Sequence, residues 1–102
     1  SQRCMDSKDQ ESRPKLRVHY CPQCGWLARA AWLAQELLQT FSDDVAECAL
    51  VPDKPGTFEV WAGNTRVWTR EKGHSIPEIK VLKAQVRDVI APDRALGHSE
   101  PA

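Results

Sequence analysis

The sequence has no excess of either charge and no long apolar run. Its 102 residues contain 14 Lys plus Arg and 14 Asp plus Glu, so the formal net charge is zero. A balanced charge gives no general attraction to nucleic acid or to an anionic membrane surface. No stretch approaches the roughly 18 apolar residues of a membrane helix. We therefore predict neither a nucleic-acid partner nor a membrane partner.

Methionine is also scarce, and the cysteines are few. There are four cysteines, and Met5 is the single methionine. We expect Met5 to be the native first residue, preceded by four added residues. The three remaining cysteines are an odd number, which suits a disulfide scaffold poorly. No secretory leader is recognised, so we expect a reducing cytoplasmic setting, where a close CxxC pair is redox-active or metal-binding.

The composition predicts one domain between two tails. Residues 1–15 are polar and carry too few apolar side chains to offset the entropy of ordering, so a disordered tail is expected. Residues 16–91 are long enough for one hydrophobic core. After Pro92, residues 92–102 are expected to be irregular.

The first half of the domain reads as strand, helix and strand. Residues 16–20 alternate between apolar and polar, residues 26–41 have helical periodicity, and residues 45–51 read as a second strand. This order predicts a right-handed crossover between two parallel strands. The helix is expected to bury Leu27, Ala30, Ala31, Ala34, Leu37, Leu38 and Phe41.

The second half reads as a hairpin followed by a helix. Gly63-Asn64 favours a type II′ turn between residues 57–62 and 65–70. That turn predicts cross-strand pairs of Val60 with Val67 and of Trp61 with Arg66. One face would then carry Phe58, Val60, Ala62 and Val67, and the other Glu59, Trp61, Arg66, Trp68 and Arg70.

The final helix is expected to begin near Ser75-Ile76-Pro77-Glu78, where a serine three residues before a glutamate forms a capping box. Its predicted apolar stripe is Ile79, Leu82, Val86, Val89 and Ile90. The complete order is β-α-β-β-β-α, a parallel unit joined to an antiparallel one. We predict an α/β (α+β) domain of the thioredoxin-like class, with a mixed four-stranded sheet and both helices on one face.

The most informative motif is Cys21-Pro22-Gln23-Cys24, between the first strand and the first helix. The positive end of the helix dipole lies at such a turn and favours a thiolate, the reactive form of cysteine. Lowering a thiol pKa from about 8.5 to about 7 requires roughly 2 kcal/mol of thiolate stabilisation. A dithiol of this kind can cycle between reduced and disulfide states.

Two other interpretations of the pair remain open, a structural disulfide and a zinc site. Zinc usually needs four ligands in two close pairs, and no second CxxC or HxxxH is present, so no metal is predicted. Cys48 is expected to point into the core beside Leu50 as inert packing. His19 is either a residue that tunes the thiols or a surface histidine.

Four residues are candidates for the rim around the dithiol. Gly25 and Trp26 follow it directly, and Pro55 and Gly56 lie in the loop before the third strand. In thioredoxins a cis-proline before that strand lies against the dithiol, and Pro55 is the nearest candidate here.

Several motifs together resemble the selenoprotein W-like group, the Rdx family, in its bacterial branch. They span residues 16–100 and comprise Tyr20-Cys21-x-x-Cys24-x-Trp26, the helix segment 29–37, Gly56-x-Phe58-Glu59-Val60, Ile76-Pro77-Glu78-Ile79-Lys80 and Leu96-Gly97-His98-Ser99. The resemblance implies a thioredoxin-like fold and a small thiol oxidoreductase, with glutathione as a candidate electron donor. In family members with selenocysteine, selenium occupies the position of Cys24. This chain has sulfur at both positions, so the order of attack by Cys21 and Cys24 stays open.

The leading hypothesis is a thiol–disulfide oxidoreductase with Cys21 and Cys24 as the catalytic pair and no bound cofactor. Its partner would be a protein carrying a disulfide or an oxidised thiol. The alternative is a redox-sensing interaction module, in which the dithiol switches the surface around Trp26 without turnover. Repeated reduction of a disulfide substrate distinguishes the enzyme from the sensor.

Overall fold

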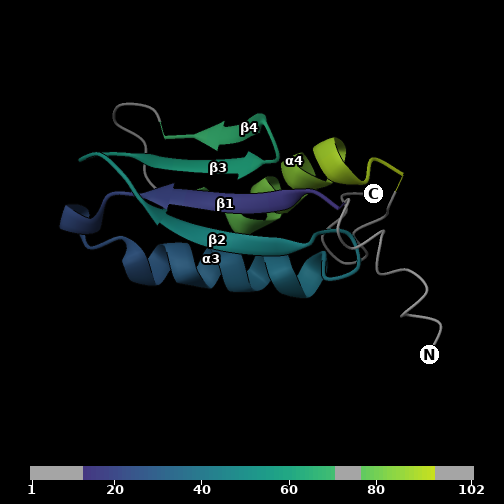
Figure 1. The fold of residues 1–102 in the computed structure, drawn as a ribbon, viewed down its shortest axis with the longest axis horizontal. Helices are drawn as coiled ribbons and strands as arrows, with labels where there is room; N and C mark the ends of the chain where they lie inside the picture. Colours follow the sequence, from purple (N-terminus) through teal and green to yellow (C-terminus); the bar gives the residue numbers. More distant parts are fainter. Residues whose placement is uncertain (1–12, 71–76, 94–102) are drawn as a thin grey trace.

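A computed structural model of the protein describes residues 13–70 and 77–93. Its elements follow the predicted order, and Figure 1 shows their arrangement. They are β1 (Lys15–Tyr20), the 3₁₀ turn η1 (Pro22–Cys24), α3 (Leu27–Thr40), β2 (Glu47–Pro52), β3 (Phe58–Ala62), β4 (Thr65–Thr69) and α4 (Ile79–Ile90). Much of both predicted tails lies outside the described residues.

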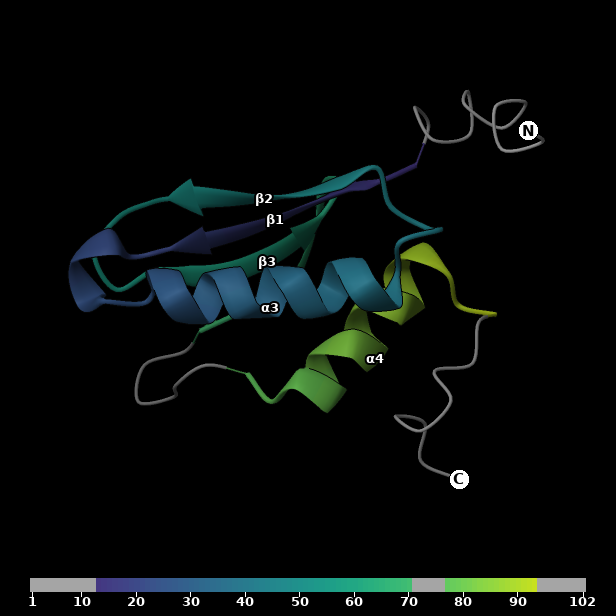
Figure 2. The ribbon, with the colours of Figure 1, turned by 90° about the horizontal axis from the view of Figure 1, so that it is seen from below.

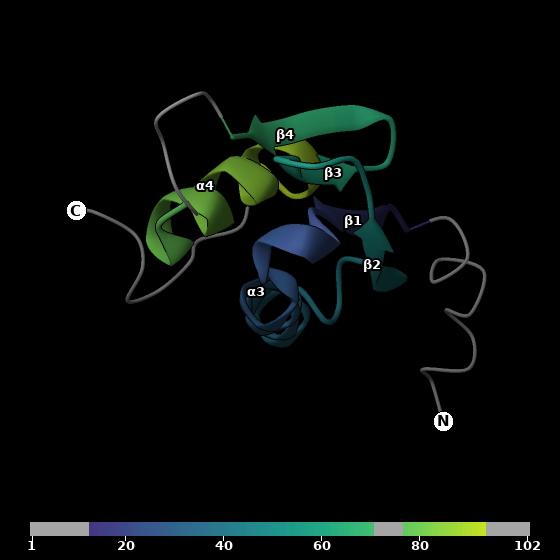
Figure 3. The ribbon, with the colours of Figure 1, turned by 90° about the vertical axis from the view of Figure 1, so that its left-hand side faces the viewer.

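The four strands form one mixed sheet in the order β2-β1-β3-β4. β1 is parallel to β2 and antiparallel to β3, and β3 is antiparallel to β4. Both helices lie on the same side of this sheet (Figures 2 and 3). The predicted α+β class, with a mixed sheet and helices on one face, is confirmed, and the arrangement is consistent with a thioredoxin-like fold.

The core forms between the sheet and the inner face of α3. The fully buried side chains of β1, Leu16 and Val18, face α3, which contributes Leu33 and Leu37. The predicted helical stripe was partly wrong, because it omitted Leu33 and included two exposed leucines. Leu27 is 50% exposed and Leu38 is 38% exposed, because neither lies on the helix face that packs against the sheet. That face is formed by Ala30, Leu33, Ala34, Leu37 and Phe41.

The hairpin contains a feature that the sequence did not predict. Gly63 has a φ of 60° and Asn64 does not have positive φ, in agreement with a type II′ turn. Trp61 pairs with Arg66 as predicted, but Val60 pairs with Trp68, so that Val67 is an extra residue in β4. The predicted pair of Val60 with Val67 is therefore wrong, because a β-bulge changes the register.

The bulge also changes the faces of the residues that follow it. Trp68 packs against the core, with its ring edge-on to Phe58 at 6.1 Å between centroids. The Arg70 guanidinium carbon lies 5.0 Å from the centre of the Trp26 ring. The predicted position of Trp68 and Arg70 on the polar face is wrong, because one extra residue reverses the alternation of side chains.

The second helix, α4, begins at Ile79, later than predicted. Glu78 is its N-cap and has extended backbone (φ −70°, ψ 135°) without a side-chain cap, so the predicted capping box is not formed by Glu78. Ser75 and Ile76 lie outside the described residues. Leu82 and Val86 are buried as predicted, but Val89 is 40% exposed.

The two helices are tied together by an ion pair. The largely buried Lys83 of α4 places its Nζ 3.2 Å from a carboxylate oxygen of Glu36 on α3. In the part of the chain that the structure describes, no helix is long and apolar enough to cross a membrane.

Candidate functional site

Cys21 and Cys24 are paired as a disulfide at the end of β1. Their Cα atoms are 5.4 Å apart, and the backbone N–H of Cys24 donates to the carbonyl oxygen of Cys21 at 3.3 Å. Gly25 follows in the left-handed region with a φ of 74°. Glycine adopts this backbone without steric cost, so it lets the chain turn from η1 into α3.

The two sulfur-bearing residues differ in exposure. Cys21 directly follows Tyr20, the last paired residue of β1, and it is fully buried. Cys24 lies in the one-turn helix η1 beyond the end of the sheet, and it is exposed. An external thiol can therefore approach Cys24 more readily than Cys21.

The amino-terminal end of α3 lies beside the pair. Trp26 is the N-cap residue of α3, and its carbonyl oxygen accepts the backbone N–H of Ala30 at 2.8 Å. No acidic residue occupies the first turn of α3, so no carboxylate there offsets the positive end of the helix dipole. This environment is suited to holding a thiolate at Cys24.

Trp26 connects the start of α3 to the sheet. Its ring lies edge-on to Phe58 at 5.7 Å between centroids and under the guanidinium of Arg70 at 5.0 Å. The backbone N–H of Arg70 donates to the carbonyl of Phe58 at 2.8 Å. The sheet register pairs Phe58 with Tyr20, next to Cys21, so Arg70 belongs to the dithiol end of the molecule.

Arg70 is a site residue that sequence reasoning missed. Its Nε is buried and has no hydrogen-bond partner. Strand alternation placed it on the polar face, and no glycine or proline within β4 (Thr65–Thr69) signals the bulge that moves it. The guanidinium of Arg70 lies over Trp26, at the dithiol end of the molecule, where a positive charge favours deprotonated thiols.

His19 forms a hydrogen bond with Asp53 on the polar face of the sheet. Its Nδ1 is 2.9 Å from Oδ2 of Asp53, and the backbone N–H of Asp53 donates to Tyr20 at 2.8 Å. The pKa of the Asp53 carboxyl is lowered, mainly by the hydrogen bond with His19 and to a smaller extent by the hydrogen bond from the backbone N–H of Lys54. Since the other ring nitrogen of His19 has no hydrogen-bond partner, His19 bonds neither sulfur.

The loop before β3 contains the other predicted rim residues. Pro55 has a trans peptide bond, so it lacks the cis form expected of the thioredoxin proline. The ladder between β1 and β3 ends at the pair Tyr20–Phe58, which leaves Thr57 as the residue in line with Cys21. A rim role for Pro55 and Gly56 stays a prediction.

The remaining cysteine of the described residues, Cys48, is half-buried. It pairs with Leu16 on the edge strand β2, where Leu50 is also partly exposed. Its side chain packs against the core as predicted, but on this edge strand both Cys48 and Leu50 are only partly covered. Burial, with a smaller contribution from the charge of Glu47, raises the pKa of the Cys48 thiol to about 12. Across residues 13–70 and 77–93, no group of three His, Cys, Asp or Glu is placed to hold a metal ion.

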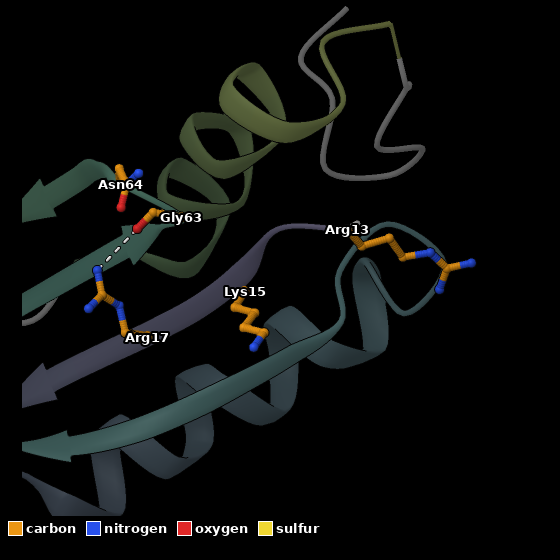
Figure 4. A pocket seen from close by; sticks show the side chains of 5 residues that line it. All are labelled: Arg13, Lys15, Arg17, Gly63 and Asn64. Carbon is orange, nitrogen blue, oxygen red and sulfur yellow. Dashed lines mark hydrogen bonds between the residues drawn. The ribbon is translucent and has the colours of Figure 1, made fainter. Parts of the chain in front are cut away.

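A basic hollow of about 340 Å³ lies beside the first residues of β1, whereas the dithiol follows the last residue of that strand. Figure 4 shows the residues that line the hollow. Arg17 donates to the carbonyl of Gly63 at 3.0 Å and also lies over the Trp61 ring. Figure 4 shows Arg13 and Lys15 pointing away from Arg17 and from each other. The three cations do not converge on one point, so the hollow is not a built site for a small anion.

Comparison with known proteins identifies the family. The Rdx family model matches residues 15–88. A solved structure from Bordetella parapertussis is 49% identical, with a TM-score of 0.72, and the match covers 76% of this chain and 99% of that one.

A selenoprotein W-related protein from Vibrio cholerae is 44% identical, with a TM-score of 0.71, and the match covers 76% of this chain and 96% of that one. No curated protein matches the chain significantly. Fold, motif and family model agree, and the chain belongs to the Rdx family.

Proposed function

We propose that the protein is a thiol–disulfide oxidoreductase in which Cys24 attacks and Cys21 resolves. The observation that carries this proposal is the unequal exposure of the paired cysteines. Cys24 is exposed beside the amino-terminal end of α3, and Cys21 is buried. The accessible thiolate meets the substrate, and the sheltered thiol reacts within the molecule.

The reaction begins with both cysteines reduced. The Cys24 thiolate attacks one sulfur of a substrate disulfide, forms a mixed disulfide and releases the other substrate sulfur as a thiolate. Cys21 then loses its proton and attacks the sulfur of Cys24, which expels the second substrate thiolate. The Cys21–Cys24 disulfide forms, and the substrate disulfide has accepted two electrons.

We propose glutathione as the electron donor that restores the dithiol. A glutathione thiolate attacks exposed Cys24 and frees Cys21. A second glutathione thiolate then attacks the glutathione sulfur of that mixed disulfide, which releases glutathione disulfide and the Cys24 thiolate. A reducing compartment such as the cytoplasm supplies enough glutathione for this return step. The substrate partner is a protein carrying a disulfide or an oxidised thiol.

Single cysteine variants test the order of attack. Cys21→Ser should accumulate a mixed disulfide through Cys24 when it is incubated with a disulfide substrate, because the resolving thiol is missing. Cys24→Ser should accumulate far less, because its remaining thiol is buried. Mass spectrometry of the trapped species measures both. A wild-type protein that forms no intramolecular disulfide in oxidant, while it stays folded, would contradict the proposed function.

A further inference from the structure

Helix α3 is apolar on two faces, and the sheet covers one of them. The second face, called here the outer face, comprises Leu27, Ala28, Ala31, Trp32, Gln35, Leu38 and Gln39. At 3.6 residues per turn these seven positions lie within about 140° of the helix circumference. They carry no charge, whereas the exposed side of a surface helix is normally charged or polar.

Large apolar side chains of the outer face are exposed. Leu27 is 50% exposed and Trp32 is 46% exposed. Ala28, Arg29 and Trp32 line an open hollow of about 400 Å³. A group of exposed apolar side chains around a hollow marks an interaction surface more often than scattered exposed residues do.

The outer face begins at the proposed reaction site. Leu27 is the first residue of α3, three residues after exposed Cys24, so their Cα atoms are at most about 11 Å apart. From Leu27 to Trp32 the helix rises about 7.5 Å. If an extended polypeptide is joined to Cys24 through its own cysteine, the residue of that polypeptide that lies in the hollow is about two to five positions away from this cysteine.

The hollow also has a positive charge at its edge, which indicates what kind of group could bind beside the apolar surface. Arg29 is exposed and has no ion-pair partner among the described residues. The other charged residue of α3, Glu36, is already bound to Lys83. The hollow therefore offers an apolar surface edged by the guanidinium of Arg29, which forms no ion pair within residues 13–70 and 77–93.

We propose that the outer face of α3 docks the polypeptide substrate, with an apolar side chain against Trp32 and a carboxylate on Arg29. The favoured substrate is a protein disulfide in which an aromatic or aliphatic residue and an acidic residue lie two to five positions from the cysteine. This inference rests on the proposed function, because the docked chain presents its sulfur to Cys24. Continuity with that sulfur and the unpaired charge favour a substrate over a second copy of the chain.

Synthetic peptides test the proposal. Each carries one cysteine as a mixed disulfide with thionitrobenzoate: the first peptide reads Cys-Gly-Gly-Phe-Asp, the second replaces Phe by Ala, and the third replaces Asp by Arg. Attack by reduced protein releases the coloured thiolate and leaves the peptide joined to Cys24, after which Cys21 displaces the peptide thiolate. We expect the first peptide to react about tenfold faster than the other two. The symmetric thionitrobenzoate disulfide, which has no peptide, measures the chemistry alone.

Variants locate the preference. Trp32→Ala should remove the advantage of Phe over Ala, and Arg29→Glu should reverse the preference so that the arginine peptide reacts faster than the aspartate peptide. Val81→Ala and Lys80→Glu make matched changes at exposed positions of α4 and should alter neither preference. Trp32→Ala, Val81→Ala and Lys80→Glu should reduce the symmetric disulfide at the wild-type rate. For Arg29→Glu the preference is taken as the ratio of two peptide rates, so that the effect of its charge on the thionitrobenzoate carboxylate, which all the peptides share, cancels.

Three results would overturn the proposal. Equal rates for the three peptides, with normal reduction of the symmetric disulfide, would remove the docking face and leave the proposed function intact. Sedimentation that shows a wild-type dimer and a monomeric Trp32→Ala variant would assign the face to a second copy. Failure to reduce the symmetric disulfide would remove the proposed function and this inference with it.

Discussion

The three cysteines of the described residues should differ widely in reactivity once the protein is reduced. The perturbation is alkylation with iodoacetamide across a range of pH, resolved by peptide mass spectrometry. A thiolate reacts and a thiol does not, so the rate follows the thiolate fraction of each cysteine. Cys24 is exposed beside a helix terminus, Cys21 is buried, and Cys48 is half-buried with a strongly raised pKa.

The expected alkylation rate of Cys48, relative to an unperturbed thiol, follows from its pKa. A thiol with the ordinary pKa of 9.0 is about one-tenth thiolate at pH 8, and a thiol with a pKa of about 12 is about one ten-thousandth thiolate. Cys48 should therefore react roughly 1000-fold more slowly than an unperturbed thiol, before any steric protection is added. Its rate should rise about tenfold per pH unit without a plateau below about pH 11. Cys24 should react fastest and should reach its plateau first.

Denaturant provides the control for this experiment. In unfolded protein the three cysteines lose their environments, and their rates should converge on one ordinary profile. Cys48→Ala identifies the peptide signal without touching the dithiol. If Cys48 in the folded, reduced protein reacts within about tenfold of Cys24 at pH 8, burial on β2 does not raise its pKa.

The raised pKa of Cys48 also makes the folded state sensitive to alkali. The pKa of Cys48 is higher in the folded state than in the unfolded state, so above pH 9 the unfolded chain loses this proton more readily. The contribution of the neutral thiol to the stability of the folded state is therefore fully present below pH 9 and is lost as pH rises through about 12. Between pH 8 and pH 10 the wild type should lose at most about 1.4 kcal/mol of unfolding free energy relative to Cys48→Ala. Urea unfolding of both proteins at the two pH values measures the difference, and an unchanged difference would contradict the assignment.

Three further predictions concern packing and charge. Leu33→Ala should lower the free energy of unfolding by about 2–5 kcal/mol, whereas Leu38→Ala should lower it by less than about 1 kcal/mol. Equal losses in urea unfolding would mean that Leu33 does not lie on the buried face of α3. Asp53→Asn should lower the free energy of unfolding at neutral pH. Because the folded pKa of Asp53 is lowered, the difference in unfolding free energy between variant and wild type should shrink as pH falls below 3.8. A difference that does not change with pH would exclude the hydrogen bond to His19 as its cause. Arg70→Met should slow the alkylation of Cys24 at neutral pH, and Arg70→Lys should restore part of the rate, because a positive charge at this end of the molecule favours the thiolate. Equal rates for the wild type and Arg70→Met would show that this charge does not act on the thiols.

Much of the fold was predictable because each element has its own local signal. Alternation marks β1, helical periodicity marks α3, and Gly63-Asn64 fixes the turn between β3 and β4. The CxxC motif at a strand-to-helix junction was also sufficient to place both cysteines at the amino-terminal end of α3.

The errors came from features that depend on tertiary contacts. The bulge at Val67 has no sequence signature in β4, yet it reverses the faces of Trp68 and Arg70. The choice between Leu33 and Leu38 depends on which arc of α3 faces the sheet, and both arcs are apolar. For the same reason, the exposed outer face could not be distinguished from core by its composition.

The type II′ turn of the hairpin has a practical consequence. The turn between β3 and β4 lies at the end of the sheet opposite to the carboxyl end of β1, where the dithiol follows (Figure 1). Its residues are Gly63 and exposed Asn64. A chemical handle introduced at Asn64 would fasten the protein to an electrode with its reactive sulfur facing the bulk solution. Electron exchange could then be recorded by voltammetry while candidate proteins flow past.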